Sequence, residues 1–430
     1  MAERVDRGPL VSGPARRSPV AATAAEPVAR PGPGAPDPVD AGRLRPAWAE
    51  IDLDAVRHNA GVLARLAAPA SLCAVVKADG YGHGAVPVAT AALEGGATHL
   101  AVALVEEGRR LREAGIGSPV LVLSQPVPAA MPEVVASGLT PTLYTRAGVE
   151  AVADAVRAAG RHRPLAVHVK VDTGMHRVGA APEEAVALAE TVTARPELYL
   201  EGLFTHLAVA DELGDPYTDQ QLDRFEAVVA ALARRGIRPP LLHAANSAGT
   251  VFHPRSRYGL VRCGIALYGL APAADHTGHT DVAALRPAMA LKARVSHVKE
   301  VDAGERLSYG LRHRLTEQSV VATVPIGYAD GVNRSLAAAG GCVLIGGRRR
   351  RLAGTVTMDQ IIVDCGPVGG AGGEGAGGRV AVGDEVVLIG RQGDEVLTAW
   401  EWAKRTGTIA YEVICGVSVR VPRTYRQAGR

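Results

Sequence analysis

The sequence predicts an α/β protein in which a (β/α)₈ barrel is followed by a mostly-β C-terminal domain. Over residues 46–285, eight short apolar runs alternate with longer amphipathic stretches, which is the rhythm of successive βα units. After Arg286 and Pro287 the pattern changes to period-two alternation with glycine and aspartate turns, which is typical of antiparallel strands. The length of 430 residues and the hydrophobic content of 47% are sufficient for two domains with cores of their own.

We expect the chain to divide into three parts. Residues 1–45 are rich in proline, alanine and arginine and have no periodicity, which is the composition of a disordered tail. They also lack the apolar segment of a secretory signal. Residues 46–285 are assigned to the barrel and residues 286–425 to the β domain. The glycine-rich stretch over 366–378 is predicted to be a flexible loop between two strands of that domain.

The predicted barrel strands are short and end in polar residues or turns. They end near Lys77, Leu104, Ser124, Tyr144, Asp172, His206, Ser247 and Ala266. Helical patterns lie between them, for example over 105–115 and 217–235. A doubly wound sheet has the same local rhythm, but the count of eight units favours the barrel. In the C-terminal domain, alternation over 288–298, 319–324 and 386–389 predicts strands, and 397–406 predicts one short helix.

Composition excludes several classes of partner. The net charge of +3 is close to balance, so we expect no nucleic acid and no membrane surface as a partner. No apolar run approaches the ~18 residues of a membrane span. The five cysteines are scattered and form no CxxC pair, which fits a reducing compartment. Together with the missing signal segment, these features predict a cytoplasmic protein.

The segment around Lys77 carries the clearest chemical signal. Val75 and Val76 mark a short buried strand, and glycines at 80, 82 and 84 mark a tight turn after it. A partly desolvated lysine at the mouth of a strand is a usable nucleophile or base, whereas most strand-end lysines are simple surface residues. The glycine turn resembles a truncated dinucleotide turn, but it also exposes backbone amides that can hold a phosphate. Lysine and turn together are what a pyridoxal 5'-phosphate site needs.

Polar or ionisable residues end five of the apolar strands, and the carboxyl ends of barrel strands face the active site. They are Lys77, Lys170 with Asp172, His206, Asn246 with Ser247, and Arg262. Each one alone is compatible with a surface position, but five together favour a site. Asp211 and Glu212 are not accompanied by a nearby cluster of histidines or carboxylates, so no metal site is expected.

The segment from Val75 to Gly84 closely resembles the cofactor-lysine motif of the alanine racemases, with Gly80 where the family usually has alanine. Further motifs similar to those of the family follow in the family's order. They lie at 169–177, 204–206, 244–247, 261–269, 307–310, 325–331, 356–360 and 410–412. The resemblance extends from about Trp48 to Arg423 and includes both predicted domains.

This resemblance implies an isomerase that depends on pyridoxal 5'-phosphate. Lys77 would bind the cofactor and act as the base on one face of the substrate, and Tyr309 would be the base on the opposite face. Arg262 would face the pyridine nitrogen and keep it unprotonated, because arginine does not give up its own proton. The phosphate would be bound by Tyr81, Ser247, Tyr411 and the backbone amides of Gly264 and Ile265.

The resemblance also implies the remaining site residues. Arg177 and the Met358 amide would hold the substrate carboxylate, while His206 and Tyr328 would line the site, with His206 supporting Arg262. Lys170 aligns with a lysine that the family often carries as a carbamate. In the family the second base comes from the partner subunit, so a homodimer with shared active sites is expected.

The implied activity is the interconversion of L- and D-alanine, which supplies D-alanine for peptidoglycan synthesis. The alternatives are a racemase for serine or for a broader set of amino acids, and a non-catalytic pyridoxal-phosphate carrier. A carrier has no use for a second base, so Tyr309 argues against it. A decarboxylase of similar build is disfavoured because Arg262 stands where that class is expected to have an acid.

Overall fold

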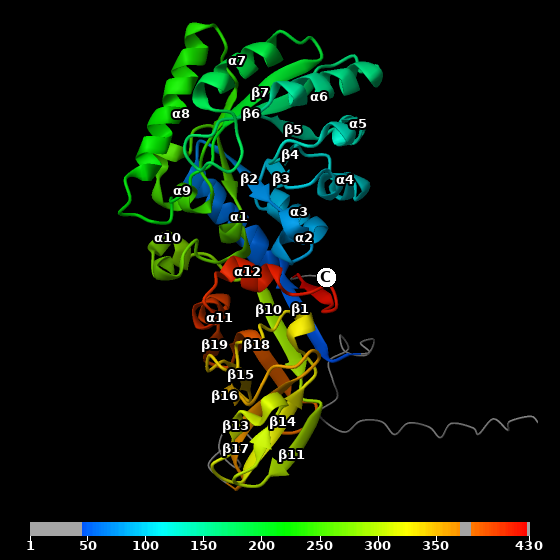
Figure 1. Ribbon diagram of the computed structural model, residues 1–430, viewed down its shortest axis with the longest axis vertical. Coiled ribbons are helices and arrows are strands. Elements are labelled where there is room, and N and C mark those ends of the chain that lie inside the picture. Colours follow the sequence, from blue (N-terminus) through cyan, green and yellow to red (C-terminus); the bar gives the residue numbers. More distant parts are fainter. Residues whose placement is uncertain (1–44, 370–379, 428–430) are drawn as a thin grey trace, which may run out of the picture. The chain divides into compact units, whose positions relative to one another are not determined.

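The computed structural model describes residues 45–369 and 380–427 of the chain (Figure 1). Eight parallel strands form one sheet in the order β8-β7-β6-β5-β4-β3-β2-β9. The strands are β2 (Ser71–Val75), β3 (His99–Val102), β4 (Val120–Val122), β5 (Thr140–Leu143), β6 (Leu165–Lys170), β7 (Leu198–Phe204), β8 (Leu241–His243) and β9 (Leu260–Cys263). The segments of β8 and β9 are joined by two backbone hydrogen bonds, from Gly259 to Leu242 and from Arg262 to Ala245, each 3.0 Å long. The sheet is therefore nearly closed, and the predicted barrel is confirmed.

Helices surround the outside of the barrel strands in Figure 1. The helical segments between residues 53 and 283 are α1 (Leu53–Ala67), α2 (Lys77–Tyr81), α3 (Ala85–Glu94), α4 (Val105–Glu113), α5 (Met131–Ala136), α6 (Arg146–Ala158), α7 (Pro182–Thr193), α8 (Tyr217–Arg234), α9 (Ser247–Phe252) and α10 (Thr280–Ala283), with 3₁₀ turns η2 (Pro128–Ala130), η3 (Pro254–Ser256), η4 (Ile265–Tyr268) and η5 (Ala274–His276). Of these, α2 is a short segment whose residues 78–80 have left-handed backbone angles. Helix α6 illustrates the packing, since Val149, Val152, Ala153 and Val156 recur at helical spacing and are all buried. Because helices cover the outer face and side chains fill the inside, the strands read as continuous apolar runs.

The second sheet is mostly antiparallel and follows the order β11-β14-β17-β16-β15-β18-β10-β1-β20, with β19 paired to β18. Its strands are β1 (Ala47–Asp52), β10 (Met289–Arg294), β11 (His297–Val301), β14 (Ser319–Val324), β15 (Cys342–Ile345), β16 (Arg348–Leu352), β17 (Ile361–Pro367), β18 (Glu385–Gln392), β19 (Glu395–Leu397) and β20 (Arg423–Arg426); β12 (Arg306–Leu307) and β13 (His313–Arg314) form a separate pair. The mostly-β second domain is confirmed.

Three details differ from the sequence-based expectations or extend them. Strand β1 pairs antiparallel with β10 and parallel with β20, so residues 47–52 belong to the second sheet although they precede the barrel. The alternating run over 288–298 is divided into β10 and β11. The predicted helix corresponds to α11 (Ala399–Thr406), and a second helix, α12 (Ala410–Cys415), follows it. Most of the predicted tail over residues 1–45 and most of the predicted loop over 366–378 lie outside the described residues. Arg45, the last residue of the predicted tail, is described and donates to Asp330.

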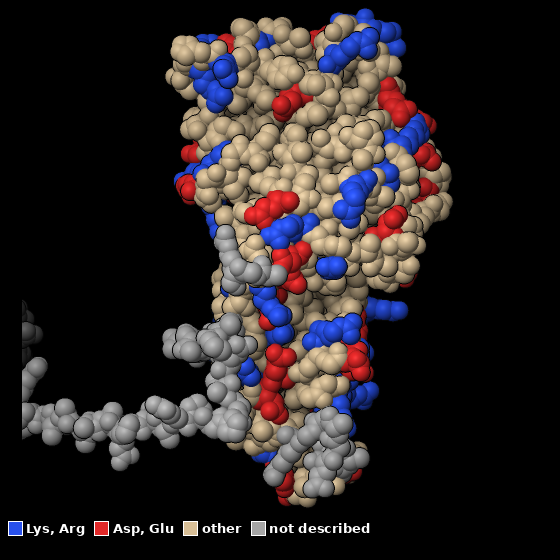
Figure 2. All heavy atoms as spheres, turned by 180° about the vertical axis from the view of Figure 1, so that it is seen from behind, with Lys and Arg blue, Asp and Glu red and all other residues tan. Residues whose placement is uncertain are grey.

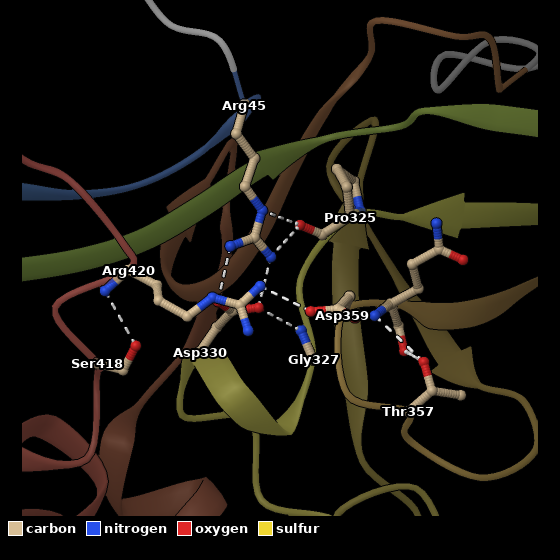
Figure 3. Close-up of polar contacts among 9 residues, drawn as sticks. Arg45, Pro325, Gly327, Asp330, Thr357, Asp359, Ser418 and Arg420 are labelled. Carbon is tan, nitrogen blue, oxygen red and sulfur yellow. Dashed lines mark hydrogen bonds and ion pairs between the residues drawn. The ribbon is translucent and has the colours of Figure 1, made fainter. Parts of the chain in front are cut away.

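A buried carboxylate joins the start of β1 to the second domain. Asp330 ends the 3₁₀ turn η7 (Tyr328–Asp330) and has no exposed side-chain surface. It accepts hydrogen bonds from Arg45 at 2.7 Å and from the Gly327 amide at 2.8 Å, and Arg420 lies 3.5 Å away (Figure 3). Burial alone raises the pKa of Asp330, but the hydrogen bonds from Arg45 and Gly327 outweigh it and lower the pKa overall. This carboxylate therefore fixes the turn that carries Tyr328.

We expect Asp330→Asn to lower the free energy of unfolding by about 2–4 kcal/mol at pH 7, because two arginines lose the charge they face. The pKa of Asp330 is lowered in the folded state, so its charge stabilises the protein fully at pH values above the ordinary carboxyl pKa. This stabilisation is lost as the pH falls through the lowered pKa of the folded state. Urea unfolding should therefore show a difference between wild type and variant that shrinks in acid. Asp359→Asn is the control, since Asp359 is exposed and forms an ion pair of 2.6 Å with the partly exposed Arg420; a loss there of the same size would contradict the assignment.

The surface carries charges of both signs. On the face drawn in Figure 2, Lys and Arg are interspersed with Asp and Glu, and neither sign covers a large continuous area. Within residues 45–369 and 380–427, no helix has the length and apolar character needed to cross a bilayer.

Candidate active site

Lys77 lies two positions after the end of β2, at the start of a turn with left-handed backbone. The φ angles of Ala78, Asp79 and Tyr81 lie between 50° and 53°, and the turn also contains three glycines with positive φ. Left-handed backbone costs about 1–2 kcal/mol for each residue that has a Cβ, so this turn needs support from its surroundings. Part of that support is a hydrogen bond of 2.6 Å from the Ala78 amide to the carboxylate of Glu107. The turn holds Lys77 at the barrel mouth.

Glu107 is a residue that sequence reasoning missed. Its second carboxylate oxygen accepts hydrogen bonds from the amides of Ala103 and Leu104, so it caps the start of α4 and grips the Lys77 turn at the same time. An acidic residue at the third position of a helix is a recognisable capping signal. Its second role depends on the neighbouring strand and has no local signal in the sequence.

Four cations converge on the mouth of the barrel. Burial lowers the pKa of Lys77, and the positive charge of Arg177 lowers it further. Burial, Arg262 and Arg177 lower the pKa of Lys170 to about 8. Two nearby carboxylates have the opposite but smaller effect: Glu107 raises the pKa of Lys77, and Asp172 raises the pKa of Lys170. The mouth is therefore suited to anionic ligands, and Lys77 gives up its proton more readily than an ordinary lysine.

Arg262 is buried at the end of β9 and is held by several acceptors. One terminal nitrogen lies 2.8 Å from Nδ1 of His243, and the other lies 3.1 Å from Nδ1 of His206. Two backbone carbonyls, of Thr205 and Ala244, also accept from it, at 2.9 Å and 3.0 Å. Burial lowers the pKa of Arg262 to about 10, which still leaves the guanidinium charged at neutral pH.

A group of hydroxyls and backbone amides forms a cradle beside Lys77. The Oγ of Ser247 accepts hydrogen bonds from the amides of Gly264, at 3.0 Å, and Ala266, at 3.3 Å. A Cβ at position 264 would lie 2.4 Å from the hydroxyl of Tyr81, so only glycine fits there. The Tyr81 ring lies 6.4 Å from that of Tyr411. Burial raises the pKa of both phenols, which keeps them protonated and able to donate to an anion.

The C-terminal segment completes this cradle. Tyr411 lies in α12, and its hydroxyl donates to the carbonyl of Pro272 at 3.4 Å. Arg423 donates to the Gly82 carbonyl at 2.9 Å, and a Cβ on Gly82 would lie only 2.6 Å from the carbonyl of Ile414. The Lys77 turn is therefore covered by residues that come from far along the chain.

The predicted site residues fall into two groups. The structure brings together the residues of the barrel mouth and α12: Lys77, Tyr81, Lys170, Arg177, His206, Ser247, Arg262, Gly264, Ile265 and Tyr411. The predicted residues of the second domain are exposed, at 75% for Tyr309, 52% for Met358 and 41% for Tyr328. Within residues 45–369 and 380–427, no hydrogen bond, ion pair or ring contact joins their side chains to the first group.

A parallel barrel that gathers its ionisable side chains at the carboxyl ends of its strands has the arrangement of a barrel enzyme. Residues 51–272 match the family model "Alanine racemase, N-terminal domain", and residues 288–425 match "Alanine racemase, C-terminal domain". The chain belongs to the alanine racemase family.

Individual relatives agree with the family models. The alanine racemase of Symbiobacterium thermophilum is 48% identical over 390 residues, which cover 90% of this chain and 99% of that protein. The crystal structure of alanine racemase from D-cycloserine-producing Streptomyces lavendulae has a TM-score of 0.82 at 37% identity, covering 90% of this chain and 98% of that one. The alanine racemase structure from E. faecalis has a TM-score of 0.81 at 39% identity, covering 90% and 99%.

Proposed function

We propose that this chain is an isomerase that interconverts L- and D-alanine with pyridoxal 5'-phosphate as its cofactor. The observation that carries the proposal is Lys77, a lysine with a lowered pKa that stands on a fixed turn beside the cradle of hydroxyls and backbone amides. Relatives named alanine racemase, such as those at 48% and 44% identity, support alanine as the substrate, in preference to serine or a broader set of amino acids. The second family model covers the domain that contains Tyr309. A simple cofactor carrier would not need a second base such as Tyr309.

The residues at the barrel mouth fit the cofactor. Lys77 would bind it covalently, and Arg262 would face its ring nitrogen. The hydroxyls of Tyr81, Ser247 and Tyr411 and the amides of Gly264 and Ile265 would hold its phosphate, in a cradle that a Cβ on Gly264 would fill. When bound, pyridoxal phosphate supplies an electron sink that stabilises negative charge at the substrate α-carbon. Because Arg262 keeps its proton, the ring nitrogen would stay unprotonated, which limits this sink and disfavours side reactions.

Racemisation requires proton transfer on both faces of one carbon, so two bases are needed. We assign Lys77 to one face and Tyr309 to the other. The carboxylate of the substrate would be held by Arg177 and the Met358 amide, with His206 and Tyr328 lining the space. Since Tyr309 is 75% exposed and makes no contact with Lys77 among the described residues, the proposal includes a homodimer in which each site takes Tyr309 from the partner chain.

We also propose a division into a barrel over 46–285 and a β domain over 286–425, with the exception of β1 (Ala47–Asp52), which pairs within the second sheet and belongs with the β domain. We further propose a cytoplasmic location in which the enzyme supplies D-alanine for peptidoglycan synthesis. The location is supported by the five cysteines, which are all free thiols.

A racemisation assay over a panel of amino acids tests the proposed function. The purified protein with pyridoxal phosphate should bring the circular dichroism of L-alanine to zero, and that of D-alanine likewise, with slower change for serine and other amino acids. If neither alanine signal changes, the proposal is rejected. If serine is racemised faster than alanine, serine is the preferred substrate.

We expect Lys170 to carry a carbamate at alkaline pH. Its Nζ lies 5.4 Å from the centre of the Phe204 ring. The positive charges of Arg262 and Arg177 act on Lys170, and a carbamate would place a negative charge near them in place of a third positive charge. Only the neutral amine attacks CO₂, so with a pKa of about 8 the occupancy should rise as pH increases through that value. With ¹³C-bicarbonate, NMR should detect a carbamate signal that grows in this range and is missing in Lys170→Arg. A signal that is independent of pH or survives the substitution would contradict this expectation.

A further inference from the structure

Behind Arg262, the interior of the barrel contains a continuous chain of four side chains. A terminal nitrogen of Arg262 lies 2.8 Å from Nδ1 of His243. Nε2 of His243 lies 2.9 Å from Nδ1 of His168, and Nε2 of His168 lies 3.1 Å from a carboxylate oxygen of Glu201. Both imidazoles are buried, whereas the Glu201 side chain is 24% exposed. The chain thus connects the buried arginine of the site with a carboxylate that reaches solvent.

Donor and acceptor chemistry allows only one direction along this chain. Arginine has donors and no acceptor, so Nδ1 of His243 must be unprotonated. Neutral His243 then carries its hydrogen on Nε2 and donates to Nδ1 of His168. His168 in turn carries its hydrogen on Nε2 and donates to Glu201, which has only acceptors when it is ionised. Burial lowers the pKa of His243 well below its ordinary value, in agreement with a neutral ring. The hydrogen bond from His168 lowers the pKa of Glu201.

Two features of the backbone make room for this arrangement. In the pairing of β6 with β7, Val167 matches Leu200 and His168 matches Gly202, so Glu201 has no partner and forms a bulge. With simple alternation of side chains along β7, Glu201 would lie on the same side as Leu203, away from His168. The bulge turns the side chain of Glu201 toward His168 instead. A Cβ on Gly202 would lie 2.5 Å from Nδ1 of His168, so glycine is required there.

Aromatic packing holds the middle of the chain in place. The ring of Phe204 stacks on His243 with centroids 4.6 Å apart and planes within 5° of each other. The same ring lies 5.1 Å from the guanidinium carbon of Arg262. This packing therefore fixes the ring plane of His243. What can still vary in the hydrogen-bond chain is which ring nitrogen of each histidine carries the hydrogen.

We propose that Glu201 is a positioning residue whose carboxylate, as the final acceptor, fixes the Nε2–H tautomers of His168 and His243 and so holds the guanidinium of Arg262 in place. The inference deepens the proposed function, on which it rests, because Arg262 faces the cofactor there. Without an acceptor at 201, His168 is free to carry its hydrogen on Nδ1. His243 must then move its own hydrogen to Nδ1, where it opposes the N–H of Arg262, and the guanidinium is displaced.

Nitrogen-15 NMR of the histidine rings in the purified protein tests the tautomers directly. Unprotonated and protonated ring nitrogens have widely separated shifts, and the two residues are assigned by the signals lost in His168→Gln and His243→Gln. We expect Nδ1 unprotonated and Nε2 protonated in both rings. An Nδ1–H tautomer or a doubly protonated ring at either position in the wild type would overturn the inference.

Variants at the far end test the effect on Arg262. Glu201→Leu should remove the single tautomer at His168 and raise the dissociation constant of pyridoxal phosphate about tenfold, measured by equilibrium dialysis. Glu201→Gln keeps an acceptor and should preserve both tautomers and most of the affinity. Gly202→Ala should disturb His168 without changing the carboxylate, which provides a second route if the leucine variant does not fold. Glu190→Leu is the matched control, because that carboxylate is exposed on α7 and pairs with Arg235.

The possible results separate this inference from the proposed function. If wild-type and Glu201→Leu proteins have the same tautomers and the same cofactor affinity, the positioning role is wrong, whether or not the protein racemises alanine. If the wild type has the expected tautomers but neither binds pyridoxal phosphate nor racemises alanine, the hydrogen-bond chain stands and the proposed function is rejected.

Discussion

Replacing Lys77 by alanine is expected to reduce alanine racemisation at least about 10⁴-fold, which is the largest effect of any single change proposed for this chain. The variant loses both the nitrogen that would bind the cofactor and the base on one face of the substrate. The other four lysines lie elsewhere: Lys170 ends β6, Lys292 pairs with Glu50 and Glu385 in the second sheet, Lys299 lies in β11 and Lys404 in α11. The rate of racemisation is measured from either enantiomer by circular dichroism.

The assignment of Lys77 has an independent chemical check. Borohydride reduction of the purified protein followed by peptide mapping should find the pyridoxyl group on Lys77. A label on Lys170 or Lys292 would defeat the assignment. Lys404→Ala serves as the control for the activity measurement, because Lys404 is exposed on α11, and it should retain wild-type activity.

The second large effect is restoration of activity in a mixture of two inactive proteins. Lys77→Ala and Tyr309→Ala subunits should each be nearly inactive, because each lacks one of the two bases. After reversible dissociation and mixing in equal amounts, about half of the dimers combine one subunit of each kind. If the sites are shared, each mixed dimer has one site with both bases and one with neither. About a quarter of the wild-type activity should then return.

The same mixture gives a different result for a site within one chain. Every site would then lack one base, and mixing would restore nothing. Subunit exchange must be demonstrated separately, for example with two differently tagged proteins that are recovered together. Negligible activity after proven exchange would reject the shared site and leave the barrel-mouth assignments unaffected.

Local sequence patterns were sufficient for the barrel and for the residues at its mouth. Lys77, Lys170, His206, Ser247 and Arg262 all lie within a few positions of the end of an apolar run, and parallel strands bring such ends to one face. The period-two alternation of the second domain likewise predicted three strand segments, over 288–298, 319–324 and 386–389, which correspond to β10 with β11, to β14 and to β18. In both cases the signal lies in a window of a few residues, so that tertiary contacts were not needed to recognise it.

Features that depend on distant pairing had no such signal. Strand β1 has the composition of any buried strand, and its place beside β10 and β20 depends on segments near the middle and the end of the chain. The bulge at Glu201 arises from the register between β6 and β7, which neither strand specifies alone. Glu107 lies in the first turn of α4 and Asp330 ends the 3₁₀ turn η7, and their partners Ala78 and Arg45 became visible only in the folded chain.

The cover over the Lys77 turn has a consequence for the order of events during synthesis. The ribosome delivers Lys77 early and completes the barrel strands long before it delivers α12 and Arg423. Until then the left-handed turn lacks the groups that close over Gly82, and the cradle lacks the hydroxyl of Tyr411. A chain that ends before residue 411 therefore has the Lys77 turn and Ser247 but lacks Tyr411 and Arg423, which cover them. For the proposed cofactor, a complete site therefore requires that translation has reached the last strand, β20 (Arg423–Arg426).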